Sequence, residues 1–173
     1  PFILDSAAPA NGLGQWSFVG CDPAAVLECR GRQARLVDRR GRDSVCETNP
    51  FLALRRLLRT LPAASANPAG VPFVGGAVGY LSYDLKNAVE RLPQAATADV
   101  PLPDLYMAVY DTIAAFAPDG QCWILSWDLP GLGGAGGLNE RRRRLIEAVK
   151  PGGAPDPGPF ACNALRSNFT RRA

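Results

Sequence analysis

The residues of this 173-residue chain with the best potential to bind a ligand lie near its start. Asp5 and Ser6 stand just before a segment rich in turn formers, and Gln15, Trp16 and Ser17 stand just beyond it. A single turn would bring a hydroxyl, a carboxamide and an indole together, which suits a small ligand with polar and aromatic parts. An ordinary capped turn uses the same residue types, so both interpretations stay open.

Groups for acid–base or metal chemistry are scarce. The chain contains no histidine, which excludes a Ser-His-Asp or Cys-His site within it and removes the commonest metal ligand. Asp84 and Asp104 are candidate catalytic carboxylates, but beside a helix start and a proline they are expected to cap amides or bind arginine. We therefore predict no catalytic residue and no metal site in this chain.

Two other segments, one rich in glycine and one rich in arginine, suggest a binding function but have a simpler structural explanation. The segment 75–79 lacks the Gly-Lys-Ser/Thr ending of a phosphate-binding loop, so its glycines are expected to mark a crowded strand. Arg141 to Arg144 would suit nucleic acid, but four consecutive residues point around a helix instead of along one face. No aromatic residue stands among them to stack on bases, and we expect a solvated helix.

Composition narrows the partners and the compartment. A net charge of +3 is too small to indicate nucleic acid or an anionic membrane. No window reaches the roughly 18 uninterrupted apolar residues that span a bilayer. We expect the cysteines to be reduced core thiols of a cytoplasmic protein, because they are odd in number and widely spaced. The five are Cys21, Cys29, Cys46, Cys122 and Cys162.

The elements that must position these residues follow from turns and hydrophobic spacing. Gly31-Arg32 and Asp119-Gly120 predict two antiparallel hairpins. Their strands are expected at 26–30 with 34–37 and at 105–116 with 122–127. A short apolar segment at 16–19 adds another strand.

Helical spacing of leucines predicts a helix over 51–61, with Asn49 as its cap and Pro50 at its first position. Asn139 is expected to cap a second helix over 140–149, after a flexible Gly-rich connection at 129–138. Sequential strands with inserted helices predict an α+β fold of antiparallel β-sheets with flanking helices.

The two ends suggest a piece of a longer protein. The only methionine is Met107, and 167–170 reads as a helix start without its helix. We predict an N-terminal domain over 1–159, ending in a Pro/Gly linker at 151–159, and the start of a second domain over 160–173.

Five motifs occur in an order that resembles a known family: PFILDSA, WSFVGCDP, PFVGGAVGYLSYDL, LPDLYMAVYD and SNFT. Together they look like the N-terminal region of component I of the chorismate-utilising enzymes aminodeoxychorismate synthase and anthranilate synthase. The resemblance implies that this chain precedes a larger C-terminal chorismate-binding domain, which holds Mg²⁺ and the catalytic residues. It also implies a glutamine amidotransferase partner that supplies ammonia.

In this family the N-terminal domain carries a tryptophan pocket, and the resemblance assigns it to Ser6, Gln15, Trp16 and Ser17. The sequence departs from the family's Gly-Arg-Tyr-Ser-Phe, because Gln15 and Trp16 replace the arginine and the tyrosine. The cation is lost, and the indole of Trp16 is large enough to fill the pocket itself.

The Asp5 of LDSA is more similar to aminodeoxychorismate synthase, which aminates carbon 4 of chorismate on the way to para-aminobenzoate and folate. The alternative is anthranilate synthase with a tryptophan feedback site, which aminates carbon 2 and eliminates pyruvate. A stand-alone amino-acid-binding regulatory module is the second alternative.

Overall fold

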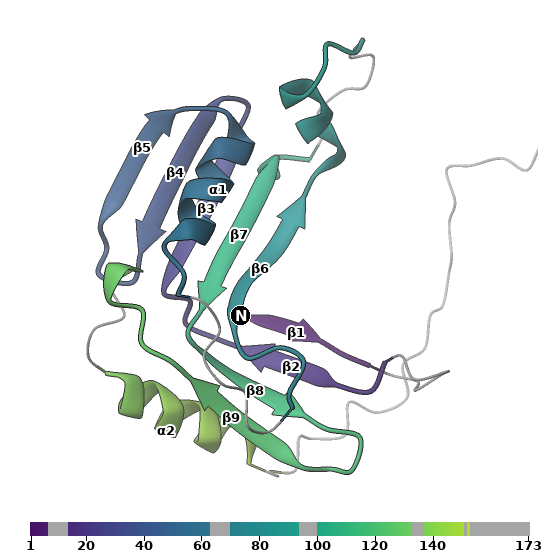
Figure 1. Cartoon of the computed structure of the whole chain (residues 1–173), viewed down its shortest axis with the longest axis vertical. Helices are drawn as coiled ribbons and strands as arrows, with labels where there is room; N and C mark the ends of the chain where they lie inside the picture. The colour runs from purple at the N-terminus through teal and green to yellow at the C-terminus, as the bar shows by residue number, and fades with distance from the viewer. Residues whose placement is uncertain (7–13, 63–69, 94–99, 133–136, 151, 153–173) are drawn as a thin grey trace, which may run out of the picture.

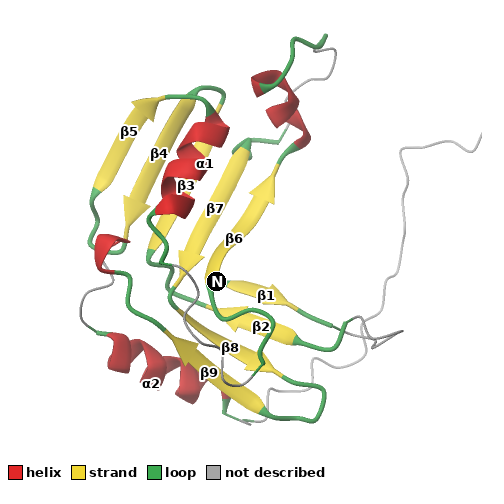
Figure 2. Cartoon of the chain, viewed as in Figure 1, coloured by secondary structure: helices red, strands yellow, loops and turns green. Residues whose placement is uncertain are grey.

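The computed structural model describes residues 1–6, 14–62, 70–93, 100–132, 137–150 and 152. Within these ranges the chain forms two antiparallel sheets with helices packed on them, as Figures 1 and 2 show. The predicted α+β class is therefore confirmed. The expected domain start at 160–173 lies outside the described residues.

The elements follow one another along the chain with short connections. The strands are β1 (Phe2–Leu4), β2 (Ser17–Gly20), β3 (Ala25–Arg30), β4 (Gln33–Asp38), β5 (Asp43–Glu47), β6 (Gly76–Leu81), β7 (Leu105–Tyr110), β8 (Thr112–Phe116) and β9 (Cys122–Ser126). The helical segments are α1 (Pro50–Arg59), the 3₁₀ helices η1 (Tyr83–Ala88) and η2 (Pro130–Leu132), and α2 (Leu138–Val149). Both predicted hairpin turns and the helix after Asn49 are confirmed.

The larger sheet has five strands in the order β5-β4-β3-β7-β6, and α1 packs across β3 and β4. A buried apolar cluster fills the space under this helix, including Leu27 of β3, Leu57 of α1 and Val109 of β7. The smaller sheet has four strands in the order β1-β2-β8-β9 and is covered by α2, which contacts β8 and β9.

A second buried cluster joins the two sheets. It contains Phe18 of β2 and Ile113 of β8 from the smaller sheet, together with Ala108 and Tyr110 of β7 from the larger one. Phe73, from the loop before β6, meets Phe18 edge to face with ring centroids 5.5 Å apart. Because these side chains are removed from water together, the relative position of the sheets is fixed by an apolar core.

The predicted single strand over 105–116 is wrong in one respect. It divides at Asp111 into β7, which pairs with β3 and β6, and β8, which pairs with β2 and β9. Asp111 is 1% exposed and accepts hydrogen bonds from the guanidinium of Arg39. At the residue where the chain changes sheets, the buried carboxylate thus has the donors that its burial requires.

The start of α1 has the predicted geometry, and the start of α2 does not. Asn49 accepts a hydrogen bond from the backbone N–H of Phe51 at 2.9 Å, and Pro50 occupies the first turn. The cap of α2 is Gly137, with φ of 71°, and Asn139 lies inside the first turn. The connection expected to be flexible contains η2, whose Leu132 is buried together with Leu129.

Among the described residues, no helix is both long enough and apolar enough to cross a membrane.

Candidate ligand-binding site

The β1–β2 pair brings together most of the residues singled out near the start of the chain. The two strands are antiparallel, with Leu4 opposite Phe18, so the residues just beyond them continue side by side. The Ser6 hydroxyl donates to the carbonyl oxygen of Trp16 at 2.7 Å. The Ser17 hydroxyl accepts from the backbone N–H of Ser6 at 3.0 Å and donates to Asp5 Oδ1 at 2.8 Å.

The Ser6 and Ser17 hydroxyl groups each donate their proton to a neighbour at the end of the β1–β2 pair, the group formed by Asp5, Ser6, Trp16 and Ser17 that we call the β1–β2 hairpin end. Ser6 and Ser17 are half-buried, and Asp5 is exposed. Each hydroxyl oxygen still has acceptor capacity, because a serine oxygen carries two lone pairs. A ligand could therefore donate to these oxygens without breaking the bonds, whereas a ligand that needs a hydroxyl proton must displace one of them.

Trp16 and Gln15 point to different environments. The ring of Trp16 is nearly parallel to that of Phe18, with an interplanar angle of 10° and centroids 6.3 Å apart, and it packs against the cluster between the sheets. Gln15 is exposed and makes no contact with Ser6 or Ser17 through a hydrogen bond. The structure thus places Ser6, Trp16 and Ser17 together and leaves Gln15 at the rim.

Gly75, just before β6, and Gly79 within it lie where a side chain would collide with neighbours, as predicted for a crowded strand, whereas a Cβ on Gly76 would meet nothing closer than 3.9 Å. A Cβ on Gly75 would lie 2.5 Å from Trp127 Nε1 and 2.9 Å from the carbonyl oxygen of Tyr110. A Cβ on Gly79 would meet the backbone of β7, 2.8 Å from Met107 Cα. These glycines allow β6 to approach its neighbours closely, which is one of the positions that only glycine tolerates.

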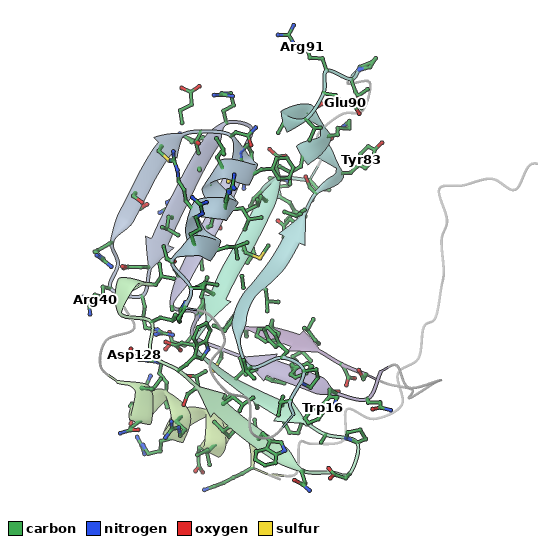
Figure 3. All side chains as sticks on the ribbon, in the orientation of Figure 1. Trp16, Arg40, Tyr83, Glu90, Arg91 and Asp128 are labelled. Atoms are coloured by element: carbon green, nitrogen blue, oxygen red, sulfur yellow. The ribbon has the colours of Figure 1, made fainter. Side chains whose placement is uncertain are left out.

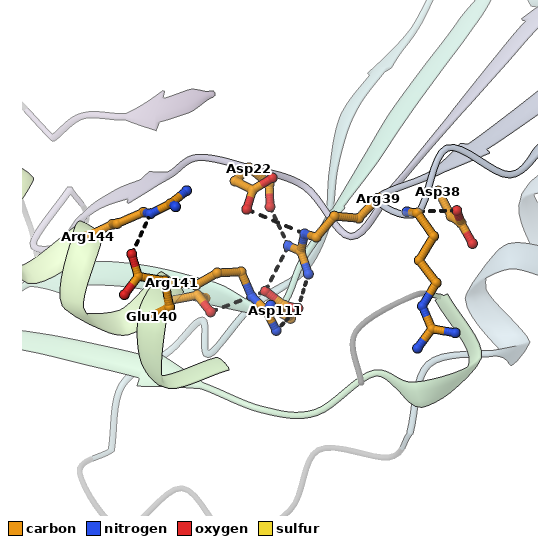
Figure 4. Close-up of polar contacts among 9 residues, drawn as sticks. Asp22, Asp38, Arg39, Asp111, Glu140, Arg141 and Arg144 are labelled. Carbon is orange, nitrogen blue, oxygen red and sulfur yellow. Dashed lines mark hydrogen bonds and ion pairs between the residues drawn. The ribbon is translucent and has the colours of Figure 1, made fainter. Parts of the chain in front are cut away.

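The most deeply buried charged residue, Asp111, was not identified as important from the sequence. Arg39 Nη1 lies 2.7 Å and Arg141 Nη2 3.1 Å from Asp111 Oδ2, as Figure 4 shows. Arg39 also donates to the carbonyl oxygen of Asp22. Although burial alone would lower the pKa of Arg39, its bonds to Asp111 and Asp22 raise that pKa above the ordinary value.

This network corrects the expectation of a solvated arginine run in α2 at one position, Arg141. Arg141 has a side chain only 10% exposed and binds the buried carboxylate, so it belongs to the core of the fold. Arg143 and Arg144 instead remain on the surface, where both bind Glu140. The sequence does contain one signal for this network: Asp111 stands alone in an apolar strand pattern, and a buried carboxylate must find cations or N–H donors.

Asp104 accepts from a backbone amide as expected, whereas Asp84 binds a lysine instead of an amide or an arginine. Asp104 Oδ2 accepts from the backbone N–H of Gly31 at 2.6 Å, which ties the β3–β4 turn to the start of β7. Asp84 binds Lys86 at 2.7 Å. In Figure 3, Tyr83 projects from η1 at the end of the molecule away from Trp16. Over the described part of the chain, no three His, Cys, Asp or Glu residues lie close enough to hold a metal ion.

The expectation of core thiols is confirmed for one cysteine only. Cys29 is buried, and this burial raises the pKa of its thiol to about 11. Cys21, Cys46 and Cys122 are exposed free thiols, and Cys162 lies outside the described residues.

Comparison with known proteins relates this fold and these motifs to one family. The chain is 33% identical over 116 residues, 66% of its length, to anthranilate synthase component 1 of Mycobacterium tuberculosis. It is 29% identical over 170 residues, 98% of its length, to aminodeoxychorismate synthase component 1 of Salmonella typhimurium. No family model matches the chain.

A solved structure supports the fold. Anthranilate synthase component I from Streptococcus pneumoniae TIGR4 superposes with a TM-score of 0.63 at 19% identity and covers 88% of this chain. The chain spans 22% of the Mycobacterium relative, 35% of the Salmonella relative and 32% of the Streptococcus structure. The chain is therefore homologous to the N-terminal part of component I of anthranilate synthase and of aminodeoxychorismate synthase.

Proposed function

We propose that this chain is the N-terminal, non-catalytic domain of an aminodeoxychorismate synthase component I. The observation that carries the proposal is the similarity to the Salmonella protein of that name, which extends over 98% of the chain. The full-length protein would aminate chorismate to 4-amino-4-deoxychorismate, using ammonia from a glutamine amidotransferase. No step of this reaction is assigned to residues of this chain, and Mg²⁺ would be held by the C-terminal domain.

Anthranilate synthase is the alternative product class. The 33% identity to the Mycobacterium protein over 116 residues favours it, although that similarity extends over less of the chain. The two enzymes differ in the carbon of chorismate that is aminated and in pyruvate loss, so the product distinguishes them.

The role proposed for the domain is to support the rest of component I through the surface formed by β6 and η1. This β6–η1 surface consists of the exposed apolar residues Tyr80, Leu81, Tyr83, Val89 and Leu92. Tyr83 is 83% exposed and Val89 73%, and β6 is an edge strand. Exposed apolar side chains gathered at a free sheet edge are typical of an interaction surface. Hydrogen exchange should be slower at 80–92 in a longer protein that includes the C-terminal domain than in this chain alone.

The product assay tests the enzyme proposal directly. A protein extended through the C-terminal domain should consume chorismate with Mg²⁺ and ammonia, and its product should be identified by mass spectrometry. Aminodeoxychorismate is expected, and the 173-residue chain alone is expected to leave chorismate unchanged. Anthranilate with pyruvate would establish the alternative, and an extended protein that neither binds nor consumes chorismate would exclude both.

An amino-acid-binding role for the β1–β2 hairpin end is the second candidate. The half-buried hydroxyls of Ser6 and Ser17 favour a ligand with an ammonium donor, and Trp16, whose carbonyl oxygen accepts from Ser6, places an aromatic residue in the same segment. Tryptophan has both an ammonium group and an aromatic part. Because Trp16 already packs against Phe18, a second indole would have to bind beside it or displace it.

Calorimetry of the extended protein with tryptophan tests this candidate. Ser6→Ala should remove most of the heat if the Ser6 oxygen accepts from the ligand, and Gln15→Ala should change it little. An absence of binding heat in the unmodified extended protein would exclude the tryptophan site while leaving the product assay unaffected.

A further inference from the structure

The packing of α1 on the larger sheet leaves a cavity on the β5 side. The cavity has a volume of about 160 Å³ and lies between α1 and the strands β3, β4 and β5. Its lining is mostly aliphatic: Leu27, Ala34, Leu36, Ala53 and Leu57. Ser44, Cys46, Arg56 and Thr60 complete it and are exposed, so the cavity opens to solvent.

The register of the strands explains why the cavity exists. Leu27 lies beside Leu36 and then Ser44, so this row of side chains becomes smaller and more polar toward β5. The next row behaves alike, with Ala34 beside Cys46 at the edge. The helix packs on β3 and β4, and every residue of β5 is exposed. Small side chains beneath the uncovered flank of the helix leave a hole that the chain itself does not fill.

Arg56 places a positive charge in the lining of the cavity. Within the described chain its guanidinium has no hydrogen bond or ion pair. The two carboxylates of β5 are used elsewhere, since Asp43 binds Arg35 and Glu47 binds Arg32. No carboxylate lines the cavity. A planar guanidinium beside an apolar recess is complementary to a carboxylate that carries an apolar group.

We propose that this cavity is a binding site for a monocyclic aromatic carboxylate, with the ring against the aliphatic lining and the carboxylate on Arg56. An enclosed aliphatic cavity on the order of 150 Å³ holds one benzene ring, and this recess has a similar volume although it opens to solvent, so one ring is the size of ligand that it matches. The Thr60 hydroxyl already donates to the carbonyl oxygen of Leu57 at 2.7 Å, so its proton is not available to a ligand. The polar partners that remain at the opening are weaker than the Arg56 guanidinium. None of the residues that line this cavity belongs to the group formed by Ser6, Trp16 and Ser17.

Benzoate is the probe, and amide chemical shifts of the ¹⁵N-labelled 173-residue chain are the measurement. A ligand of about nine non-hydrogen atoms is expected to bind with a dissociation constant on the order of 1 mM. Saturable shifts are expected at Ala34, Ser44 and Ala53. The uncharged analogue benzyl alcohol should bind about tenfold more weakly, because it lacks the charge-assisted hydrogen bond.

Three variants distinguish a specific binding site from an imperfection in packing that binds no ligand. Arg56→Gln should weaken benzoate about tenfold and leave benzyl alcohol unchanged, whereas Arg59→Gln, exposed on the same helix outside the lining, should change neither. Cys46→Phe should fill the opening from the exposed strand β5 and abolish binding of both. No saturable shift with benzoate, equal benzoate affinity in Arg56→Gln, or unchanged binding in Cys46→Phe would each overturn the proposal.

Discussion

At the scale of single residues, buried charge has the largest predicted effect. Asp111→Asn leaves the nearly buried guanidiniums of Arg39 and Arg141 without their carboxylate. Removing one partner of a buried ion pair typically costs about 3–5 kcal/mol. Urea denaturation of the 173-residue chain should therefore show a large loss in the free energy of unfolding.

Asp43→Asn is the matched control for Asp111→Asn. Asp43 accepts a pair of hydrogen bonds from Arg35, but both side chains are about half exposed. Solvent screens such a pair, so its loss should cost much less than the loss of the Asp111 carboxylate. Equal destabilisation by the two substitutions would contradict a special role for the network around Asp111.

A second residue-scale prediction concerns pH and Glu140. Hydrogen bonds from Arg143 and Arg144 lower the pKa of Glu140 from 4.5 to about 2. Because the folded pKa lies below the unfolded one, the stabilisation is present above pH 4.5 and is lost as pH falls toward 2. An NMR titration of the Glu140 carboxyl in the folded chain should give a midpoint well below that of an unperturbed glutamate.

Replacing both arginines, with Arg143→Gln and Arg144→Gln, should return the Glu140 midpoint toward its ordinary value. The stability change itself should be small, since all three side chains are exposed and solvent screens their interaction. A midpoint that stays low after both substitutions would show that the arginines are not the cause.

Close backbone approach provides a third prediction. Gly79→Ala would place its Cβ against the backbone of β7, which cannot move as a flexible side chain can. Overpacking of this kind costs about 1–3 kcal/mol or more. Thermal unfolding of the two variants should show this loss for Gly79→Ala and almost none for Gly131→Ala, where a Cβ would meet nothing within 4 Å.

At the scale of elements, residues close together in the sequence were sufficient to predict the turns and the start of α1. They were not sufficient to predict which strands pair. Gly31-Arg32, Asp119-Gly120 and Asn49-Pro50 each specify a turn or a helix start through their own backbone preferences, and all three are confirmed. The division at Asp111 depends on Arg39 and Arg141, which are distant in sequence. A pattern of neighbouring residues cannot show that Asp111 binds these two arginines.

The two helix starts yield a paired prediction. Asn49→Ala removes the side-chain oxygen that accepts from Phe51, so it should cost about 1 kcal/mol of unfolding free energy. Asn139→Ala, at the position the sequence suggested as a cap, should change stability by less than about 0.5 kcal/mol, because Gly137 is the cap of α2. Similar losses for both in urea denaturation would contradict the observed start of α2.

The candidate site was predictable to the same extent. The pairing of β1 with β2 brings Ser6 to Ser17, and the two residues are only eleven positions apart in the sequence, so their proximity could be anticipated. The packing of Trp16 against Phe18 and the cluster containing Phe73 could not, because it depends on how the two sheets meet. A gap such as the cavity beside α1 is likewise set by three-dimensional packing, which sequence periodicity does not describe.

At the scale of the whole molecule, the two sheets are expected to unfold as one unit. Phe2 of β1 and Tyr110 of β7 belong to different sheets, yet their rings meet edge to face with centroids 4.6 Å apart. A pair of this kind contributes about 0.5–1.5 kcal/mol beyond its buried area. A double-mutant cycle of Phe2→Leu and Tyr110→Leu should therefore give a coupling energy in that range, measured by urea denaturation.

The control cycle combines Phe2→Leu with Tyr80→Leu. Tyr80 pairs with Tyr106, four residues before Tyr110 on β7, and lies about 13 Å farther along the sheet at the rise of a strand. The two substitutions should add to within about 0.5 kcal/mol, because distant sites act independently. If the cross-sheet cycle were also additive, and fluorescence and circular dichroism gave separate transitions, the two sheets would be independent units. The shared core between them would then hold position without carrying cooperativity.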